Sequence, residues 1–147
     1  MSYILKAIPL KTERHLPIYS TEDCQNLIDA YEDFYPKFGF NPPWIGYFIF
    51  RADQIVGSAS FVGPPKEGVV EIAYWTFKDY EKQGVASFAC KELVMIAHRE
   101  NPNIRVTAKT APEPNASTRI LEKSGFVFSN TVQDEEIGNA WLWIFES

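Results

Sequence analysis

The sequence lacks the features that define several simple classes of protein. It has only two cysteines, Cys24 and Cys90, in 147 residues, and no cluster of Cys and His at metal-ligand spacing, so neither a disulfide framework nor a metal site is expected. The longest apolar stretch, near residues 44–50, is far shorter than the roughly 20 residues of a membrane-spanning helix. We therefore expect no metal and no membrane partner.

An excess of basic residues is also missing. The chain has 14 Lys and Arg against 19 Asp and Glu, a formal net charge of −5. Proteins that bind nucleic acid neutralise phosphates with clustered Lys and Arg, so no nucleic-acid partner is expected. A hydrophobic content of 46% excludes a disordered chain. The length suits one domain, residues 1–147, and Lys6 interrupts the N-terminal apolar segment too early for a secretory signal, so we expect a cytoplasmic protein.

Strand and helix patterns alternate along the chain. Strand patterns occupy residues 3–10, 44–51, 54–62, 69–77 and 104–110, and a final pair is expected at 126–129 and 140–145. Helix patterns begin at Ser20 or Thr21, at Val85 and at an Asn115 cap, and end at Pro36 to Gly39, at Asn101 and at Gly125. This order predicts an α/β (α+β) fold, a mixed sheet with helices on its faces and one crossover from the strand at 69–77 to the strand at 104–110.

The strand at 104–110 shows the alternation of a half-buried strand. Its apolar residues are predicted to point inward: Ile104, Val106 and Ala108. Its polar residues are predicted to point outward: Arg105, Thr107 and Lys109.

The most informative stretch is VEIAYWTFKDYEKQGVA at residues 70–86, a strand followed by a short connection and by Gly84 at the start of a helix. A helix N-terminus exposes unpaired N–H groups and a partial positive charge, which bind phosphate, and glycine lets the backbone approach an anion closely. An ordinary loop glycine is the alternative interpretation. GxGxxG and GxxxxGK[ST] are both absent, which argues against a plain dinucleotide-binding or P-loop domain.

Four segments together resemble one family. They are IVGSASFVGPP (55–65), GVVEIAYW (68–75), YEKQGVASFACKEL (80–93) and PNASTRILEKSGF (114–126). In this order they resemble the GNAT superfamily of acetyl-CoA-dependent N-acetyltransferases, and within it the branch of the ribosomal-protein N-terminal acetyltransferases. The resemblance runs from about Trp44 to Phe145. It implies the GNAT fold, a mixed, mostly antiparallel sheet with a splayed parallel strand pair, flanked by helices.

The resemblance also implies a binding site for acetyl-CoA. The pyrophosphate loop would consist of Glu81, Lys82, Gln83, Gly84, Val85 and Ala86. Gly84 and Ala86 match the family pattern [Q/R]xxGx[G/A], whereas Glu81 replaces Gln or Arg and brings a carboxylate that Lys82 could offset. The strand before the loop would contact the pantetheine arm through the main chain of Ala73, Tyr74 and Trp75. The amide near Ala73 or Tyr74 would polarise the thioester carbonyl.

Asn115 is also implied as a contact to the cofactor, one residue later than the family places its asparagine.

Acid and base groups are harder to assign. Glu71 lies in an apolar run on the strand beside the implied thioester and is a candidate base; pairing with a surface Lys, or a water acting as the base, is the alternative. Ser117 resembles a serine proposed as the acid in the N-terminal acetyltransferase branch, and Leu121 stands where many members have a tyrosine. A first-turn serine that bonds local backbone is equally consistent with Ser117.

The acceptor is not fixed by the sequence. Aromatic residues gather in the segments that build the acceptor site in this superfamily: Phe34, Tyr35, Phe38, Phe40, Trp44, Trp141 and Trp143. They suit either acceptor stacking or a core. A small amine, an amino acid and a peptide N-terminus all stay open, as does a homodimer. Two other interpretations are a non-catalytic acyl-CoA-binding module of GNAT type and an unrelated α/β domain.

Overall fold

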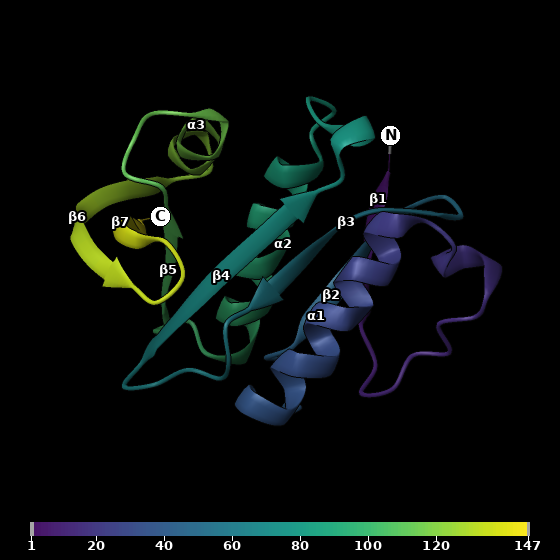
Figure 1. Ribbon diagram of the computed structural model, residues 1–147. Coiled ribbons are helices and arrows are strands. Elements are labelled where there is room, and N and C mark those ends of the chain that lie inside the picture. Colours follow the sequence, from purple (N-terminus) through teal and green to yellow (C-terminus); the bar gives the residue numbers. More distant parts are fainter. Residues whose placement is uncertain (1, 147) are drawn as a thin grey trace.

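Seven strands form one mixed sheet in the order β1-β2-β3-β4-β5-β7-β6 (Figure 1). The computed structural model describes residues 2–146. The strands are β1 (Tyr3–Ala7), β2 (Gly46–Arg51), β3 (Gln54–Phe61), β4 (Val69–Thr76), β5 (Arg105–Thr110), β6 (Phe126–Asp134) and β7 (Gly138–Phe145). Neighbouring strands are antiparallel except for the parallel pair β4 and β5. The predicted mixed, mostly antiparallel sheet is therefore confirmed.

Helices cover both faces of the sheet (Figure 1). Helix α1 (Glu22–Phe38) packs on one face, where Leu27, Ile28 and Phe48 belong to one buried cluster. Helix α2 (Val85–Glu100) packs on the opposite face, where Leu93 and Ile72 belong to a second buried cluster. The short helix α3 (Ala116–Lys123) joins that second cluster through the fully buried Leu121. In residues 2–146 no helix combines the length and apolar character needed to cross a bilayer.

The parallel pair β4 and β5 is hydrogen-bonded over only part of its length. Its register runs from Val69↔Arg105 to Ile72↔Ala108, whereas β4 continues to Thr76 and pairs there with β3 alone. The last residues of β5 pair with β7 alone. The strands therefore stop pairing after Ile72 and Ala108, which agrees with the splayed pair implied by the resemblance. We call this point the fork.

Side-chain caps fix the starts of α1 and α3. Thr21 Oγ1 accepts a hydrogen bond from the Cys24 N–H at 3.2 Å. Asn115 Oδ1 accepts one from the Thr118 N–H at 3.0 Å, while the Asn115 N–H donates to Thr118 Oγ1 at 2.9 Å. Both predicted caps are confirmed, since each satisfies an N–H that the helix leaves unpaired.

The end of α1 differs from the prediction. Pro36 does not break the helix but lies inside its last turn, and the chain leaves the helix at Gly39, whose φ of 86° favours glycine. Tyr35 holds this turn in place, because its buried hydroxyl donates to Ile8 O at 2.6 Å and accepts from the Gly46 N–H at 3.3 Å. Tertiary contacts thus outweigh the hydrogen bond that the proline removes.

Two strand predictions also need correction. The last hairpin is longer than expected, because β6 continues to Asp134 and β7 begins at Gly138. Thr107, predicted to face solvent, is buried, because β5 lies between β4 and β7 in the middle of the sheet. Its hydroxyl donates to Val70 O at 3.4 Å, which satisfies the buried polar group.

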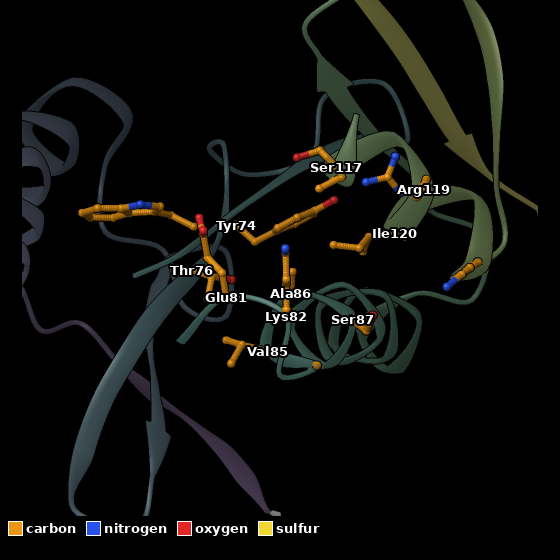
Figure 2. A pocket seen from close by; sticks show the side chains of 14 residues that line it. Tyr74, Thr76, Glu81, Lys82, Val85, Ala86, Ser87, Ser117, Arg119 and Ile120 are labelled. Carbon is orange, nitrogen blue, oxygen red and sulfur yellow. The ribbon is translucent and has the colours of Figure 1, made fainter. Parts of the chain in front are cut away.

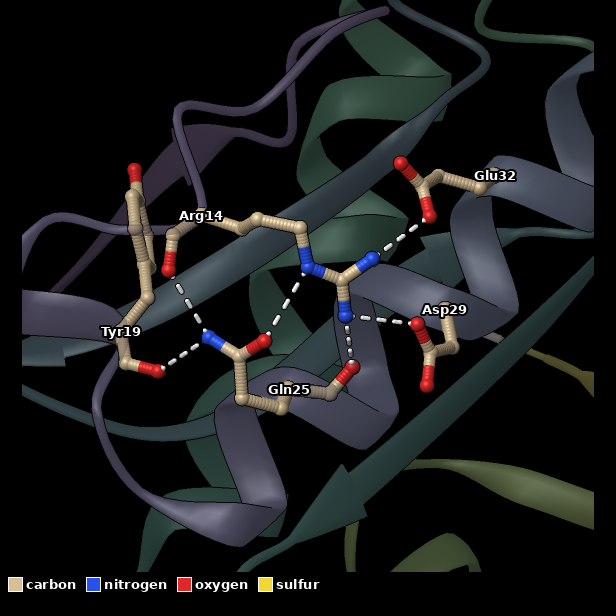
Figure 3. A network of polar contacts seen from close by, with 5 residues as sticks. All are labelled: Arg14, Tyr19, Gln25, Asp29 and Glu32. Atoms are coloured by element: carbon tan, nitrogen blue, oxygen red, sulfur yellow. Dashed lines mark hydrogen bonds and ion pairs between the residues drawn. The ribbon is translucent and has the colours of Figure 1, made fainter.

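A polar network fastens the segment between β1 and α1 to the helix (Figure 3). The guanidinium of Arg14 contacts Asp29 Oδ1 at 2.6 Å and Glu32 Oε1 at 2.8 Å. Gln25 Nε2 donates to Arg14 O at 2.9 Å and to Tyr19 O at 2.7 Å. Exposed ion pairs add little to the stability of a fold because water screens them, so the network chiefly sets the path of this segment.

Candidate active site

The loop before α2 turns its backbone toward open space. Gly84 is the N-cap of α2 with φ of 84°, and its position has no side-chain cap for the first N–H groups of the helix. A Cβ built on Gly84 would meet no atom within 4 Å. Lys82 also has a positive φ, 64°. An uncapped helix start with a left-handed glycine is the arrangement that binds phosphate through backbone amides.

Gln83 holds this loop against the neighbouring strands. Its carbonyl oxygen accepts a hydrogen bond from the Tyr3 hydroxyl at 2.7 Å, and its Oε1 accepts one from Arg51 Nη1 at 2.6 Å. Gln83 was predicted as a cofactor contact, but its side chain is engaged with β2 and it does not line the adjacent cavity. Gln83 thus holds the loop in place, and its contact with the cofactor stays a prediction.

A cavity of about 520 Å3 opens between the end of β4, the start of α2 and α3. Figure 2 shows the Tyr74 side chain crossing toward α3, where Ser117 and Ile120 lie, while Val85 and Ala86 border it from α2. The structure brings eight predicted site residues to this wall: Tyr74, Trp75, Glu81, Lys82, Gly84, Val85, Ala86 and Ser117.

Three other predicted residues lie outside the cavity wall: Glu71, Ala73 and Asn115. Asn115 caps α3 with its side chain, whose Oδ1 is engaged by the Thr118 N–H. Ala73 and Glu71 belong to the face of β4 opposite to Tyr74, because side chains alternate along a strand.

Sequence reasoning missed six residues that line the cavity: Thr76, Ser87, Ala116, Arg119, Ile120 and Lys123. The signal was present, since Ala116, Arg119, Ile120 and Lys123 have the spacing of one helix face.

Charge on the cavity wall is mainly positive. Lys82 comes from the loop before α2, and Arg119 and Lys123 come from consecutive turns of α3. Glu81 is the one acidic residue among those that line this cavity. The wall therefore carries two more basic than acidic residues, in a chain that is acidic overall, which suits an anionic ligand.

The hydroxyl of Tyr74 is buried and has no hydrogen-bond partner within the described part of the chain. Burial raises the pKa of this phenol, and the nearby Cys90 raises it further, so the group stays protonated at neutral pH. A buried hydroxyl without a partner costs about 1–3 kcal/mol. Leu121 of α3 is fully buried and has no hydroxyl, so this position of the helix supplies no proton donor.

Glu71 is part of a charged cluster on the other face of β4. Its Oε1 lies 3.3 Å from Lys109 Nζ, and the same ammonium lies 3.4 Å from Asp134 Oδ1. Burial raises the pKa of Glu71, and the positive charge of Lys109 lowers it in part. Pairing with a lysine is one of the interpretations that the sequence allows for Glu71, and the structure shows this pairing with Lys109.

The aromatic residues divide between core and surface. Tyr35 and Trp143 are buried, and Trp143 Nε1 donates to Thr110 Oγ1 at 3.0 Å. Phe38 and Phe40 keep more than a third of their surface exposed. Part of the aromatic set is therefore structural.

A short parallel pair in an antiparallel sheet, with a helix start at its fork, defines the class of GNAT domains. The family model described as acetyltransferase (GNAT) domain matches residues 8–127. The chain belongs to this family.

Two curated relatives match part of the chain. An uncharacterised N-acetyltransferase of Bacillus subtilis (strain 168), YjdG, is 32% identical over 87 residues, which cover 57% of this chain and 52% of that protein. The ribosomal-protein-serine acetyltransferase of Escherichia coli (strain K12) is 24% identical over 94 residues, 63% of this chain and 52% of that protein. The chain thus matches about half the length of these relatives.

Solved structures share the fold over nearly the whole chain. A ribosomal L7/L12 alpha-N-protein acetyltransferase in complex with coenzyme A superimposes with a TM-score of 0.68 at 15% identity, over 97% of this chain and 92% of that one. An aminoglycoside acetyltransferase in complex with coenzyme A gives 0.70 at 16%, over 97% and 94%. A chimera of a Vibrio cholerae spermidine N-acetyltransferase gives 0.73 at 14%, over 99% and 95%.

Proposed function

We propose that this domain is an acetyl-CoA-dependent N-acetyltransferase that passes the acetyl group directly to a primary amine, either a small amine or a peptide N-terminus. The observation that carries the proposal is the cavity at the uncapped start of α2, where Gly84 leaves the backbone amides open to a ligand. The family and the coenzyme A in structures of the same fold support it.

The residues of the cavity fit an anionic cofactor. Backbone N–H groups from Gly84 to Ala86 would hold the diphosphate, as helix starts do. Lys82, Arg119 and Lys123 would add positive charge, which outweighs the carboxylate of Glu81. Tyr74 and Trp75 of β4 would border the thiol-bearing arm of acetyl-CoA, which supplies an activated acetyl thioester when it is bound.

The proton transfers would use groups on both faces of β4. Glu71 would accept a proton from the acceptor ammonium, because direct transfer needs a neutral nitrogen. An amide N–H near Ala73 or Tyr74 would polarise the acetyl carbonyl. The amine would attack the acetyl carbon as the carbon–sulfur bond breaks, and Ser117, on the cavity wall, would pass a proton to the departing sulfur and regain one from the newly acylated nitrogen. The two faces would meet at the fork, where β4 and β5 stop pairing after Ile72 and Ala108.

The acceptor stays a matter of proposal. Relatives of the same fold are named for a ribosomal protein, spermidine and an aminoglycoside, so the family alone does not select one. A cytoplasmic location and a homodimer stay predictions of the sequence.

Thermal shift with acetyl-CoA and with CoA, followed by thiol release with a panel of amines, tests the proposal. We expect both ligands to stabilise the protein and at least one amine to release thiol. Binding without release would instead support a non-catalytic acyl-CoA-binding module. Absence of stabilisation by either ligand would contradict the proposed cofactor site.

A further inference from the structure

The charged cluster at the fork consists of Glu71, Lys109 and Asp134. Lys109 is the first residue of β5 beyond the last parallel pair, Ile72↔Ala108, and Glu71 lies directly before Ile72 on β4. Asp134 is the last residue of β6. Three separate strands thus bring these groups to the place where the two parallel strands stop pairing.

One ammonium serves two carboxylates in this cluster. Lys109 Nζ lies 3.3 Å from Glu71 Oε1 and 3.4 Å from Asp134 Oδ1, and each side chain keeps only about a quarter of its surface exposed, 24–27%. Asp134 also accepts hydrogen bonds from the N–H groups of Glu136 and Ile137 at 3.0 and 3.3 Å, which fix its carboxylate at the hairpin turn. With all three groups ionised, the cluster carries a net charge of −1.

A net charge of −1 matches one incoming ammonium and no more. An acceptor with one positive charge would bring these three groups to neutrality, whereas a second positive charge at the same place would face the Lys109 ammonium, whose two carboxylate contacts, Glu71 and Asp134, are already engaged. Charges at contact distance near a protein surface repel each other more strongly than they do in bulk water. A tenfold preference requires a difference of only about 1.4 kcal/mol.

We infer that Lys109 is a specificity-determining residue that restricts acceptors at the fork to amines with a single positive charge, such as a monoamine or an α-amine without a neighbouring cation. The inference rests on the proposed function, because it assigns the acceptor amine to the face of β4 that bears Glu71. A purely structural role for Lys109, as a link between β4, β5 and the final hairpin, is the competing explanation.

A matched pair of amines separates these explanations. n-Butylamine and 1,4-diaminobutane have the same carbon chain and differ by one charge. We would measure kcat/KM for each by thiol release, and the Kd of each by calorimetry on the CoA-saturated protein. Lys109→Met keeps the length of the side chain but makes the net charge of the cluster −2, and Lys109→Arg keeps the charge.

We expect the wild-type protein and Lys109→Arg to prefer n-butylamine. In Lys109→Met the ratio of kcat/KM for the diamine to that for the monoamine should rise by about tenfold, and the ratio of affinities should follow. A ratio that changes by less than about twofold, with a lowered free energy of unfolding in urea, would overturn the inference in favour of the structural role.

Two further outcomes are decisive. If acetyl-CoA stabilises the protein but neither amine binds or reacts, the inference is wrong while the cofactor site stands. If acetyl-CoA and CoA both fail to stabilise the wild-type protein, the proposed function fails and the inference falls with it.

Discussion

Replacing Tyr74 by Phe should stabilise the protein in the absence of ligand. The ring of Tyr74 packs against the cluster between the sheet and α2, and phenylalanine would keep that packing. The hydroxyl is buried without a hydrogen-bond partner, and such a group costs about 1–3 kcal/mol. We expect a gain of about 1–2 kcal/mol in the free energy of unfolding, or roughly 2–4 °C in Tm for each kcal/mol in a chain of this size.

Tyr35 provides a matched control for this substitution. Its hydroxyl is also buried but has two partners, Ile8 O at 2.6 Å and the Gly46 N–H at 3.3 Å. The same chemical change, Tyr35→Phe, should therefore destabilise the protein by about 1–3 kcal/mol, since it leaves buried backbone groups without a partner. Opposite signs for one substitution at two tyrosines with buried hydroxyls are the specific result expected from urea unfolding.

The pH dependence supplies a second readout. The pKa of Tyr74 is raised above its ordinary value of 10 by burial, so above pH 10 the unfolded chain releases this proton more readily than the folded one. The titration of this group therefore lowers the free energy of unfolding of the wild-type protein as the pH rises beyond 10. The advantage of Tyr74→Phe should widen there. A variant that is less stable than the wild-type protein by more than about 1 kcal/mol would refute the reasoning.

Three further substitutions test the proposed chemistry. Glu81→Arg should tighten acetyl-CoA binding by about fivefold, near 1 kcal/mol, because it replaces the acidic residue of the cavity wall by a basic one; unchanged or weaker affinity by calorimetry would contradict this. Ser117→Ala should lower kcat at saturating substrates by about tenfold or more, whereas full turnover would mean that another group or water supplies the proton. Glu71→Gln should lower kcat/KM by about 100-fold. Burial raises the pKa of Glu71 above 4.5 despite the opposing charge of Lys109. The activity of the wild-type protein should therefore decrease as the pH is lowered through that raised pKa. If the Glu71→Gln variant shows the same decrease on the acid side, Glu71 is not the base.

Local signals predicted most of the fold. Strand propensity located β4, helical periodicity located α2, and short-range capping chemistry located the starts of α1 and α3 at Thr21 and Asn115. The errors arose where tertiary contacts decide. Pro36 is tolerated in α1 because Tyr35 holds the last turn, and Thr107 is buried because β5 lies inside the sheet. Neither contact is visible in the local sequence.

The candidate site was predicted only in part, because local sequence patterns do not show tertiary contacts. The loop around Gly84 is contiguous in the sequence, so its pattern located it. The ion pair between Glu71 and Lys109 joins parallel strands that are far apart in the chain, and only the register of the sheet brings them together. Arg119 and Lys123 have the spacing of a helix face, but the position of that face above the cavity depends on how α3 packs.

The attachment of Gln83 to Tyr3 and Arg51 has a thermodynamic consequence. If a glycine-containing loop were mobile before binding, it would lose conformational entropy when an anion ordered it. Its affinity for the anion would be lower for that reason. Here two hydrogen bonds from other strands already hold the loop. The ordering cost is met when the chain folds, so the ligand meets a receptor shaped in advance.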